Sequence, residues 1–198
     1  MNRFTFVFIF LFTIQSFAAV YGPDQRKDIS KVPKRWKQAA SAVAVALPTF
    51  YFEDLDKNHF IHSEHDQRPY GETVGLCKGE KFFDQKSFGH CTAFLIHPKI
   101  LVSAGHCFLP TGEVEDFKHS YCENFSFWLG YNDSKNPLAS LGSKVPKKDL
   151  VHCKKVIYAT NNEQTEPKDN PVDFAIYELE KPVTHIKPLK LAKQTVRP

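Results

Sequence analysis

The sequence predicts an all-β protein, an antiparallel sandwich or barrel, and three observations support that prediction. Beyond Gln38 the apolar residues fall in short runs, several of which alternate with polar residues. Gly, Pro, Asn and Asp separate these runs, as is typical of turns between strands. No long stretch repeats its apolar residues at the 3.6-residue period of a helix. Short strands with frequent turn residues between them are typical of sandwiches and barrels.

Short apolar runs give the expected strands, and turn residues justify their boundaries. In chain order the runs are residues 42–47, 92–96, 100–102, 125–131, 150–158 and 174–179. Pro48 ends the first run, because proline cannot donate a hydrogen bond to a neighbouring strand. His97, Pro98 and Lys99 are expected to form a hairpin turn with proline in its favoured place. Two long polar insertions, residues 53–71 and 160–171, interrupt the pattern.

Residues 1–18 are expected to be a signal peptide. Arg3 supplies a positive start, residues 4–14 form an apolar run, and Ser16 and Ala18 are small residues at the positions that a signal peptidase recognises. Cleavage is therefore expected after Ala18. About eleven apolar residues are too few to span ~30 Å of hydrocarbon. We expect a secreted protein, extracellular or periplasmic, in which disulfides can form and which has no membrane partner after cleavage.

The formal net charge of +4 belongs to one segment of the chain. Residues 24–38 alone carry +4 and precede the apolar pattern. We expect residues 19–40 to be a basic pro-segment or linker, with a membrane- or acid-binding arm as the alternative, and residues 41–198 to be the folded domain. Because the rest of the chain has no basic surplus, no nucleic-acid partner is expected.

The segment around His106 carries the strongest indication of chemistry. Cys91 opens the second expected strand, and Ser103-Ala104-Gly105-His106-Cys107 follows the third. Two paired strands that end in a tight Ala-Gly turn would present His106. A Cys91–Cys107 bridge would stabilise the fold by ~3 kcal/mol in the chain-entropy model and would fix the position of the histidine. A general base needs that fixed position, since an error of ~1 Å can cost ~100-fold in rate.

Asp173 is the expected partner of this histidine. It opens the apolar run 174–179, where a carboxylate is costly to bury without a partner. An imidazole N–H would explain its position, with Asp173 setting the tautomer of His106 and stabilising the charged form of the ring.

These two motifs resemble those of the trypsin-like (chymotrypsin-fold) serine proteases. The string S-A-G-H-C (residues 103–107) is similar to their histidine motif, and D-F-A-I-Y-E-L (residues 173–179) to their aspartate motif. Residues 76–82, 125–131 and 151–156 resemble secreted bacterial members related to glutamyl endopeptidases. The resemblance covers residues 40–198. It implies a six-stranded antiparallel barrel, the first of two, with His106 as general base, Asp173 as its orienting residue, a protein or peptide substrate, and no metal or other cofactor.

The nucleophilic serine of that family is missing from this sequence. None of the eleven serines lies in a G-D-S-G or G-x-S-x-G string, and the nearest approach, Gly142-Ser143-Lys144, precedes Asp173. The chain is therefore expected to be a truncated serine endopeptidase that is inactive alone and whose partner is the missing second barrel. The alternative is a catalytically inactive single-barrel homologue that acts as a secreted binding protein. An apolar surface patch would favour the first, and a polar surface the second.

Five cysteines leave one without a partner inside the chain. Besides Cys91 with Cys107, we expect Cys122 to pair with Cys153, since each borders an expected strand. Cys77 is left over, either as a free thiol or as the partner of a cysteine in the second barrel.

Residues 54–65 contain two metal-like patterns, which we interpret as a solvated loop. Three histidines occur at a spacing of three: His59, His62 and His65. Neither a helix nor a strand gathers that spacing on one face, so a zinc site is not expected. Asp54, Asp56 and Asn58 mimic the start of a calcium loop, but histidines stand where the central glycine and the closing glutamate are required. A secreted metal-binding module is kept as a third alternative.

Overall fold

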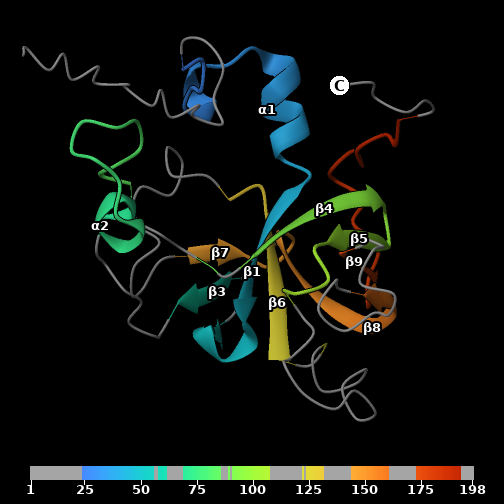
Figure 1. Cartoon of the computed structure of the whole chain (residues 1–198). Helices are drawn as coiled ribbons and strands as arrows, with labels where there is room; N and C mark the ends of the chain where they lie inside the picture. Colours follow the sequence, from blue (N-terminus) through green and yellow to red (C-terminus); the bar gives the residue numbers. More distant parts are fainter. Residues whose placement is uncertain are drawn as a thin grey trace, which may run out of the picture.

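Six strands close into an antiparallel barrel in the computed structural model, which describes residues 24–55, 58–61, 69–85, 89, 91–107, 122, 124–131, 144–160 and 173–192 (Figure 1). The barrel strands are β1 (Val43–Pro48), β4 (Cys91–His97), β5 (Ile100–Ser103), β6 (Phe125–Leu129), β8 (Leu150–Thr160) and β9 (Phe174–Leu179). Around the barrel they follow the order β1-β4-β5-β9-β8-β6. The prediction of an all-β protein with a six-stranded antiparallel barrel is confirmed, and each expected strand lies within two residues of its observed bounds.

Alternation of side chains along the strands fills the barrel interior. On β4, Ala93 and Leu95 are buried, whereas Phe94 between them is exposed. The largest side chains of the interior are Phe127 of β6 and Tyr177 of β9, whose ring centroids lie 5.6 Å apart. Each large apolar side chain buried in this way contributes roughly 1.5–3 kcal/mol, so the interior is the main source of the barrel's stability.

A second, three-stranded sheet covers one side of the barrel. Its strands are β2 (Phe52–Leu55), β3 (Asn58–Ile61) and β7 (Lys144–Pro146), and a short helix, η2 (Thr49–Tyr51), leads from β1 into it. Val145 of β7 packs with Leu47 of β1 and Trp128 of β6 in an apolar cluster separate from the barrel interior. The outward-facing side chains of Leu47 and Trp128 are therefore buried.

The polar insertion expected at residues 53–71 is not one continuous loop. Residues 53–55 and 58–61 belong to the hairpin of β2 and β3, and helix α2 (Tyr70–Val74) follows later in the chain. The hairpin forms because its backbone pairs in register and β7 adds a third strand, which the polar composition of the segment conceals. Of the second insertion, residues 161–171 lie outside the described residues, while Thr160 ends β8.

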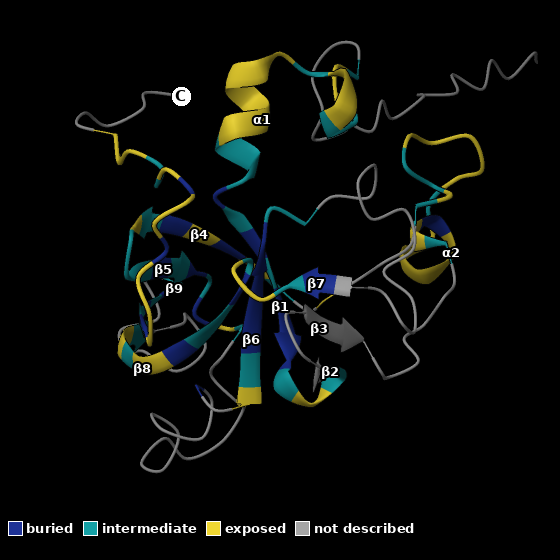
Figure 2. Ribbon diagram, turned by 180° about the vertical axis from the view of Figure 1, so that it is seen from behind, coloured by how far each residue is buried: buried dark blue, intermediate teal, exposed yellow. Residues whose placement is uncertain are grey.

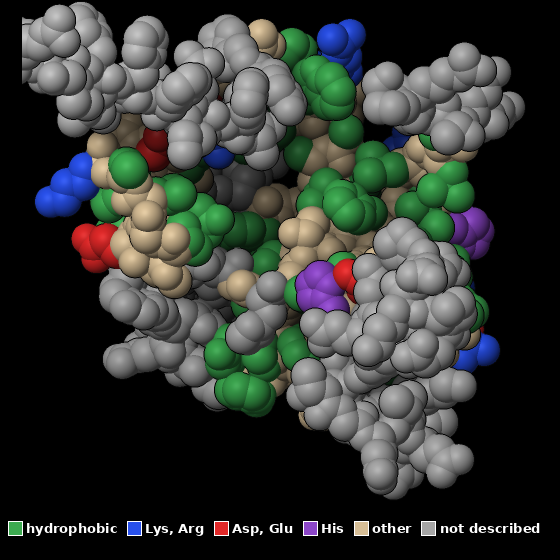
Figure 3. Space-filling view, viewed as in Figure 1, with side chains coloured by type: hydrophobic (Ala, Val, Ile, Leu, Met, Phe, Trp, Pro, Cys, Tyr) green, Lys and Arg blue, Asp and Glu red, His purple; other side chains and the backbone are tan. Residues whose placement is uncertain are grey.

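The opposite side of the barrel presents an apolar row to the outside. The strand register aligns Phe94 with Val102, Val102 with Ile176, and Ile176 with Tyr158, across β4, β5, β9 and β8. Phe94 is 41% exposed and Tyr158 is 51% exposed, and the two residues between them are half-buried. We call these four residues the outer row. Figure 3 shows hydrophobic side chains at several places on the surface of the face viewed in Figure 1.

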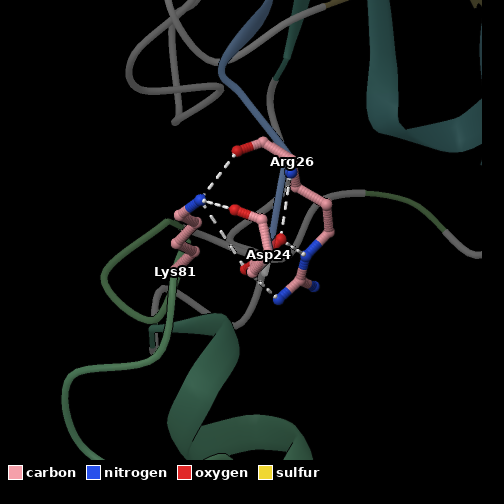
Figure 4. Close-up of polar contacts among 3 residues, drawn as sticks. All are labelled: Asp24, Arg26 and Lys81. Carbon is pink, nitrogen blue, oxygen red and sulfur yellow. Dashed lines mark hydrogen bonds and ion pairs between the residues drawn. The ribbon is translucent and has the colours of Figure 1, made fainter. Parts of the chain in front are cut away.

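The basic N-terminal segment is held against the rest of the protein. It contains η1 (Ile29–Lys31) and the largely exposed helix α1 (Lys34–Ala40), seen from behind in Figure 2. Lys81 donates hydrogen bonds to the backbone carbonyls of Asp24, at 2.5 Å, and Arg26, at 3.1 Å (Figure 4). The Arg26 guanidinium bonds the Asp24 carboxylate, and this hydrogen bonding lowers the pKa of Asp24 to about 2. The prediction that residues 19–40 are a pro-segment stays a prediction.

The expected secretion of this protein has indirect support from its disulfides. The predicted signal peptide, residues 1–18, lies outside the described residues. Within the part of the chain that the structure describes, no helix has the length and apolar character needed to cross a membrane. The structure contains two disulfides, which are typical of proteins from oxidising compartments.

Candidate functional site

Strand pairing brings His106 next to Asp173 across 67 residues of sequence. Ser103, the last residue of β5, is aligned with Ala175 near the start of β9. His106 lies three residues beyond the end of β5, and Asp173 directly precedes β9. In an antiparallel pair the end of one strand meets the start of the other, so both residues lie at the same edge of the barrel.

The carboxylate of Asp173 contacts His106 at two points. Its Oδ1 accepts the backbone N–H of His106 at 2.8 Å, and its Oδ2 lies 2.5 Å from the ring Nδ1. The side chain of His106 is 64% exposed and that of Asp173 is 28% exposed. The carboxylate is therefore partly shielded, while the imidazole that it holds is open to solvent.

The electrostatics of this pair favour an ionised aspartate. Burial acts to raise the pKa of Asp173, but hydrogen bonds from the side chain and backbone of His106 outweigh it, and the pKa lies below its ordinary value. The backbone of Gly105 acts in the same direction. An ionised carboxylate can only accept hydrogen bonds, so Nδ1 of His106 carries a proton, and in the neutral ring Nε2 is then the acceptor.

A disulfide fixes the backbone beside this histidine. Cys91 and Cys107 are bonded, with their Cα atoms 6.0 Å apart, so the start of β4 is tied to the residue after His106. On the other side, the buried Ser103 donates its hydroxyl to the carbonyl of Thr92 at 2.7 Å. The predicted Cys91–Cys107 pair is confirmed, and it holds the segment that carries the imidazole to the neighbouring strand.

Of the other three cysteines, two form a disulfide and one is free, as the sequence predicts. Cys122 is bonded to Cys153 of β8, which confirms the second expected pair. Cys77 is a free thiol at the surface of the segment that follows α2. A partner for Cys77 in a second barrel stays a prediction.

The geometry of His106 and Asp173 is suited to proton transfer. General base catalysis requires a histidine whose tautomer is set by a partner and whose second nitrogen can reach the reacting group. Nδ1 of His106 is held by the carboxylate, and the ring is open to solvent. The arrangement can therefore accept a proton at Nε2 and stabilise the imidazolium that results.

None of the serines that the structure describes completes a triad with His106. They are Ser30, Ser41, Ser103 and Ser126. The hydroxyl groups of Ser30 and Ser41 bond groups within the N-terminal segment, and that of Ser103 bonds the backbone of β4. Ser126 lies 3.0 Å from Nδ1 of His152, but its side chain is completely buried, so no substrate can reach it.

A metal centre that uses the sulfurs of Cys91 and Cys107 is excluded by their disulfide. Donor atoms of Cys91, His106 and Cys107 lie within 4.8 Å of one another. Both sulfurs, however, are bonded to each other, and a metal would require them as thiolates. The cluster is therefore a histidine next to a disulfide.

The metal-like patterns of residues 54–65 fall on the β2–β3 hairpin. Asp54 belongs to β2, and Asn58 and His59 belong to β3, with Asp54 aligned with His59. The interpretation of this segment as a solvated loop is thus wrong for these three residues, because they pair as strands. Asp56, His62 and His65 lie outside the described residues.

Sequence reasoning missed a second histidine–aspartate pair. His185 Nε2 lies 2.8 Å from Asp149 Oδ1, beside a cavity that is also lined by Lys147, Lys148 and Lys181. The residues come from the turn before β8 and from the chain after β9, so no spacing in the sequence indicates the contact. The one local feature of the sequence that could have indicated this cavity is the pair of adjacent lysines, Lys147 and Lys148.

No family model matches the chain, and no curated protein sequence matches it.

Proposed function

We propose that this chain is the histidine-bearing barrel of a secreted serine endopeptidase. In this proposal His106 is the general base, Asp173 orients it, and a nucleophilic serine comes from polypeptide outside the present sequence. The reaction would be acyl transfer, in which a serine hydroxyl attacks a peptide carbonyl while His106 accepts its proton.

One observation supports the proposal above all others. The carboxylate of Asp173 holds both the backbone N–H and the ring Nδ1 of His106, and the ring remains 64% exposed. A histidine that served only the packing of the barrel would not need an ionised partner and an open second nitrogen. The nearby disulfide, which ties Cys107 to β4, adds the fixed position that a general base requires.

The outer row supports the presence of a further folded unit. Next to the three-stranded sheet β2-β3-β7, the outward-facing side chains of Leu47 on β1 and Trp128 on β6 are almost completely buried. On the opposite side, Phe94 and Tyr158 are left 41% and 51% exposed. An apolar row across four strands is unusual on the surface of a free-standing domain and is typical of an interface. We propose that the unit that supplies the serine covers this row.

The outer row also separates this proposal from its alternative. A single-barrel binding protein without catalytic function would be expected to have a polar surface on that side. It would also have no need for the exposed, carboxylate-bound His106. Both features favour the endopeptidase over the inactive homologue.

The test uses the longest protein that the gene produces and that contains this chain. This protein is treated with a serine-directed fluorophosphonate probe, and covalent labelling is measured. We expect the unmodified product to react. His106→Ala should abolish the reaction within the time of the assay, and Asp173→Asn should slow it by about 10⁴-fold, because the tautomer of the histidine is lost. His97→Ala is the matched control, since His97 is an exposed histidine at the turn between β4 and β5, and the strand register places it far from Asp173.

Two results would overturn the proposal. One is that the full-length protein, folded and with both disulfides formed, does not react with the probe. The other is a His106→Ala variant that reacts as fast as the His97→Ala control, which would place the reactive serine in another site.

A further inference from the structure

A cavity of about 420 Å³ opens at the end of β9 that is remote from Asp173. It is lined by residues 147–148 of the turn before β8, by the first three residues of β8, and by residues 180–185, which follow β9. Glu180 lies seven residue steps after Asp173, and the six residues between them form β9. At ~3.3 Å per residue, the cavity lies roughly 20 Å from the aspartate that holds His106.

Basic side chains predominate around this cavity. Three lysines line it, namely Lys147, Lys148 and Lys181, and the one carboxylate among the lining residues is that of Glu180. The concentration is local, because residues 39–198 together carry a formal charge of −1. Lys148 and Lys181 are exposed, so their ammonium groups can turn toward a ligand without the cost of burying a charge.

Two histidines in the cavity wall have polar partners among residues that do not line the cavity. Nε2 of His185 lies 2.8 Å from the carboxylate of Asp149. Nδ1 of His152 lies 3.0 Å from the hydroxyl of Ser126, which is completely buried. The walls are therefore built on the barrel itself, and the Asp149 carboxylate is directed to a histidine.

The remaining lining of the cavity is partly apolar. Leu150 and Val183 are 4% and 3% exposed and form the fixed part of the wall, beside Val151 and Pro182. Cavities of 300–1,000 Å³ that combine an apolar wall with a few polar groups are typical of small-molecule sites. The charges select an anion, and the apolar wall can contact an organic group attached to it.

We propose that this cavity binds the phosphate or sulfate group of a small organic monoester. Lysine binds phosphate as a compact point charge and does not need the bidentate geometry of arginine, which is absent from the residues that line the cavity. Lys148 and Lys181 approach the anion from the turn and from the chain after β9. The site does not depend on the proposed protease function, since it lies at the other end of β9.

The test is isothermal titration of the purified, disulfide-bonded chain with four probes: phenyl phosphate, phenyl sulfate, inorganic phosphate and inorganic sulfate. We expect saturable binding of the two phenyl esters that weakens as the salt concentration rises. The inorganic anions should bind at least tenfold more weakly, because they do not contact the apolar wall. Equal affinities for the esters and the inorganic anions would contradict the organic part of the proposal and identify a site for the free anion.

Charge variants locate the binding. Lys148→Gln with Lys181→Gln should lower the affinity for phenyl phosphate at least tenfold, and Glu180→Gln should raise it. Lys190→Gln is the matched control, because Lys190 is an exposed lysine on the same C-terminal segment that does not line the cavity. Thermal unfolding of each variant confirms that surface substitutions leave the fold intact.

The proposal fails if no probe binds saturably at millimolar concentration. It also fails if the double variant binds phenyl phosphate as the unmodified chain does, or if Lys190→Gln weakens binding equally. The last result would show a general attraction to lysines at the surface rather than a site.

Discussion

Removal of the Cys91–Cys107 bridge should destabilise the barrel. The size of the loss should depend on the length of the loop that the bridge closes. The change is Cys91→Ala with Cys107→Ala, which opens a loop of 16 residues. The chain-entropy relation gives about 3 kcal/mol for a loop of this size at 25 °C, because the unfolded chain regains the conformations that the bridge forbids. For the Cys122–Cys153 bridge, with a separation of 31 residues, the same relation gives about 4 kcal/mol.

The assay is urea unfolding of the oxidised chain, followed by circular dichroism and extrapolated to water. We expect the free energy of unfolding to fall by about 3 kcal/mol without Cys91–Cys107 and by slightly more without Cys122–Cys153. Cys77→Ala is the matched control, since this thiol is exposed and belongs to neither bridge, and it should change the free energy by less than about 0.5 kcal/mol.

The result can refute the reasoning in two ways. If loss of Cys91–Cys107 costs less than about 1 kcal/mol, loop closure is not the basis of its contribution. If its loss costs clearly more than loss of the longer Cys122–Cys153 loop, the bridge stabilises the folded segment around His106 directly. That second outcome would make the bridge part of the site rather than a general constraint on the chain.

Two further predictions concern the aspartate and the outer row. Because its pKa is lowered in the folded state, Asp173 adds stability that is complete above its ordinary pKa of about 4 and is lost as pH falls through the folded value. Urea unfolding between pH 2 and 6 should therefore show a smaller acid-induced loss for Asp173→Asn than for the unmodified chain, and equal losses would contradict the hydrogen bonds described. Phe94→Ser with Tyr158→Ser should change the free energy of unfolding of the isolated chain by less than about 1 kcal/mol, whereas Leu47→Ala on the covered side should cost 2–5 kcal/mol. A comparable cost for the two changes would show that the outer row is already packed within this chain.

The barrel could be predicted because its strands carry their own signal. On β9, for example, Ala175, Tyr177 and Leu179 are buried and alternate with less buried residues, a period-2 pattern that is visible in the sequence. The β2–β3 hairpin has no such signal, since residues 53–55 and 58–61 contain few apolar positions. It is stabilised by pairing with β7, some 85 residues later in the chain, which no local pattern can indicate. Helix α1 gives no clear signal for another reason, because it is only seven residues long and its lysines and arginine are equally typical of a charged linker.

The two sites also differ in how far the sequence indicates them. His106 and Asp173 were predicted together because each lies in a recognisable local string, and the β5–β9 register then places both at one edge. Lys148 and Lys181 were not predicted, because neither lies in a motif. They share a cavity only because antiparallel pairing of β8 with β9 brings the start of one strand to the end of the other.

The two proposed sites use opposite ends of the same strand, and this arrangement makes them independently testable. Roughly 20 Å of β9 separates Asp173 from the lysine-lined cavity, more than twice the Debye length of about 8 Å at physiological salt. Charge changes at one end should therefore not reach the other through space. Lys148→Gln with Lys181→Gln should leave fluorophosphonate labelling unchanged, and Asp173→Asn should leave the affinity for phenyl phosphate unchanged. If either substitution altered the distant readout, the coupling would have to pass through β9 itself, as a shift in its register or packing.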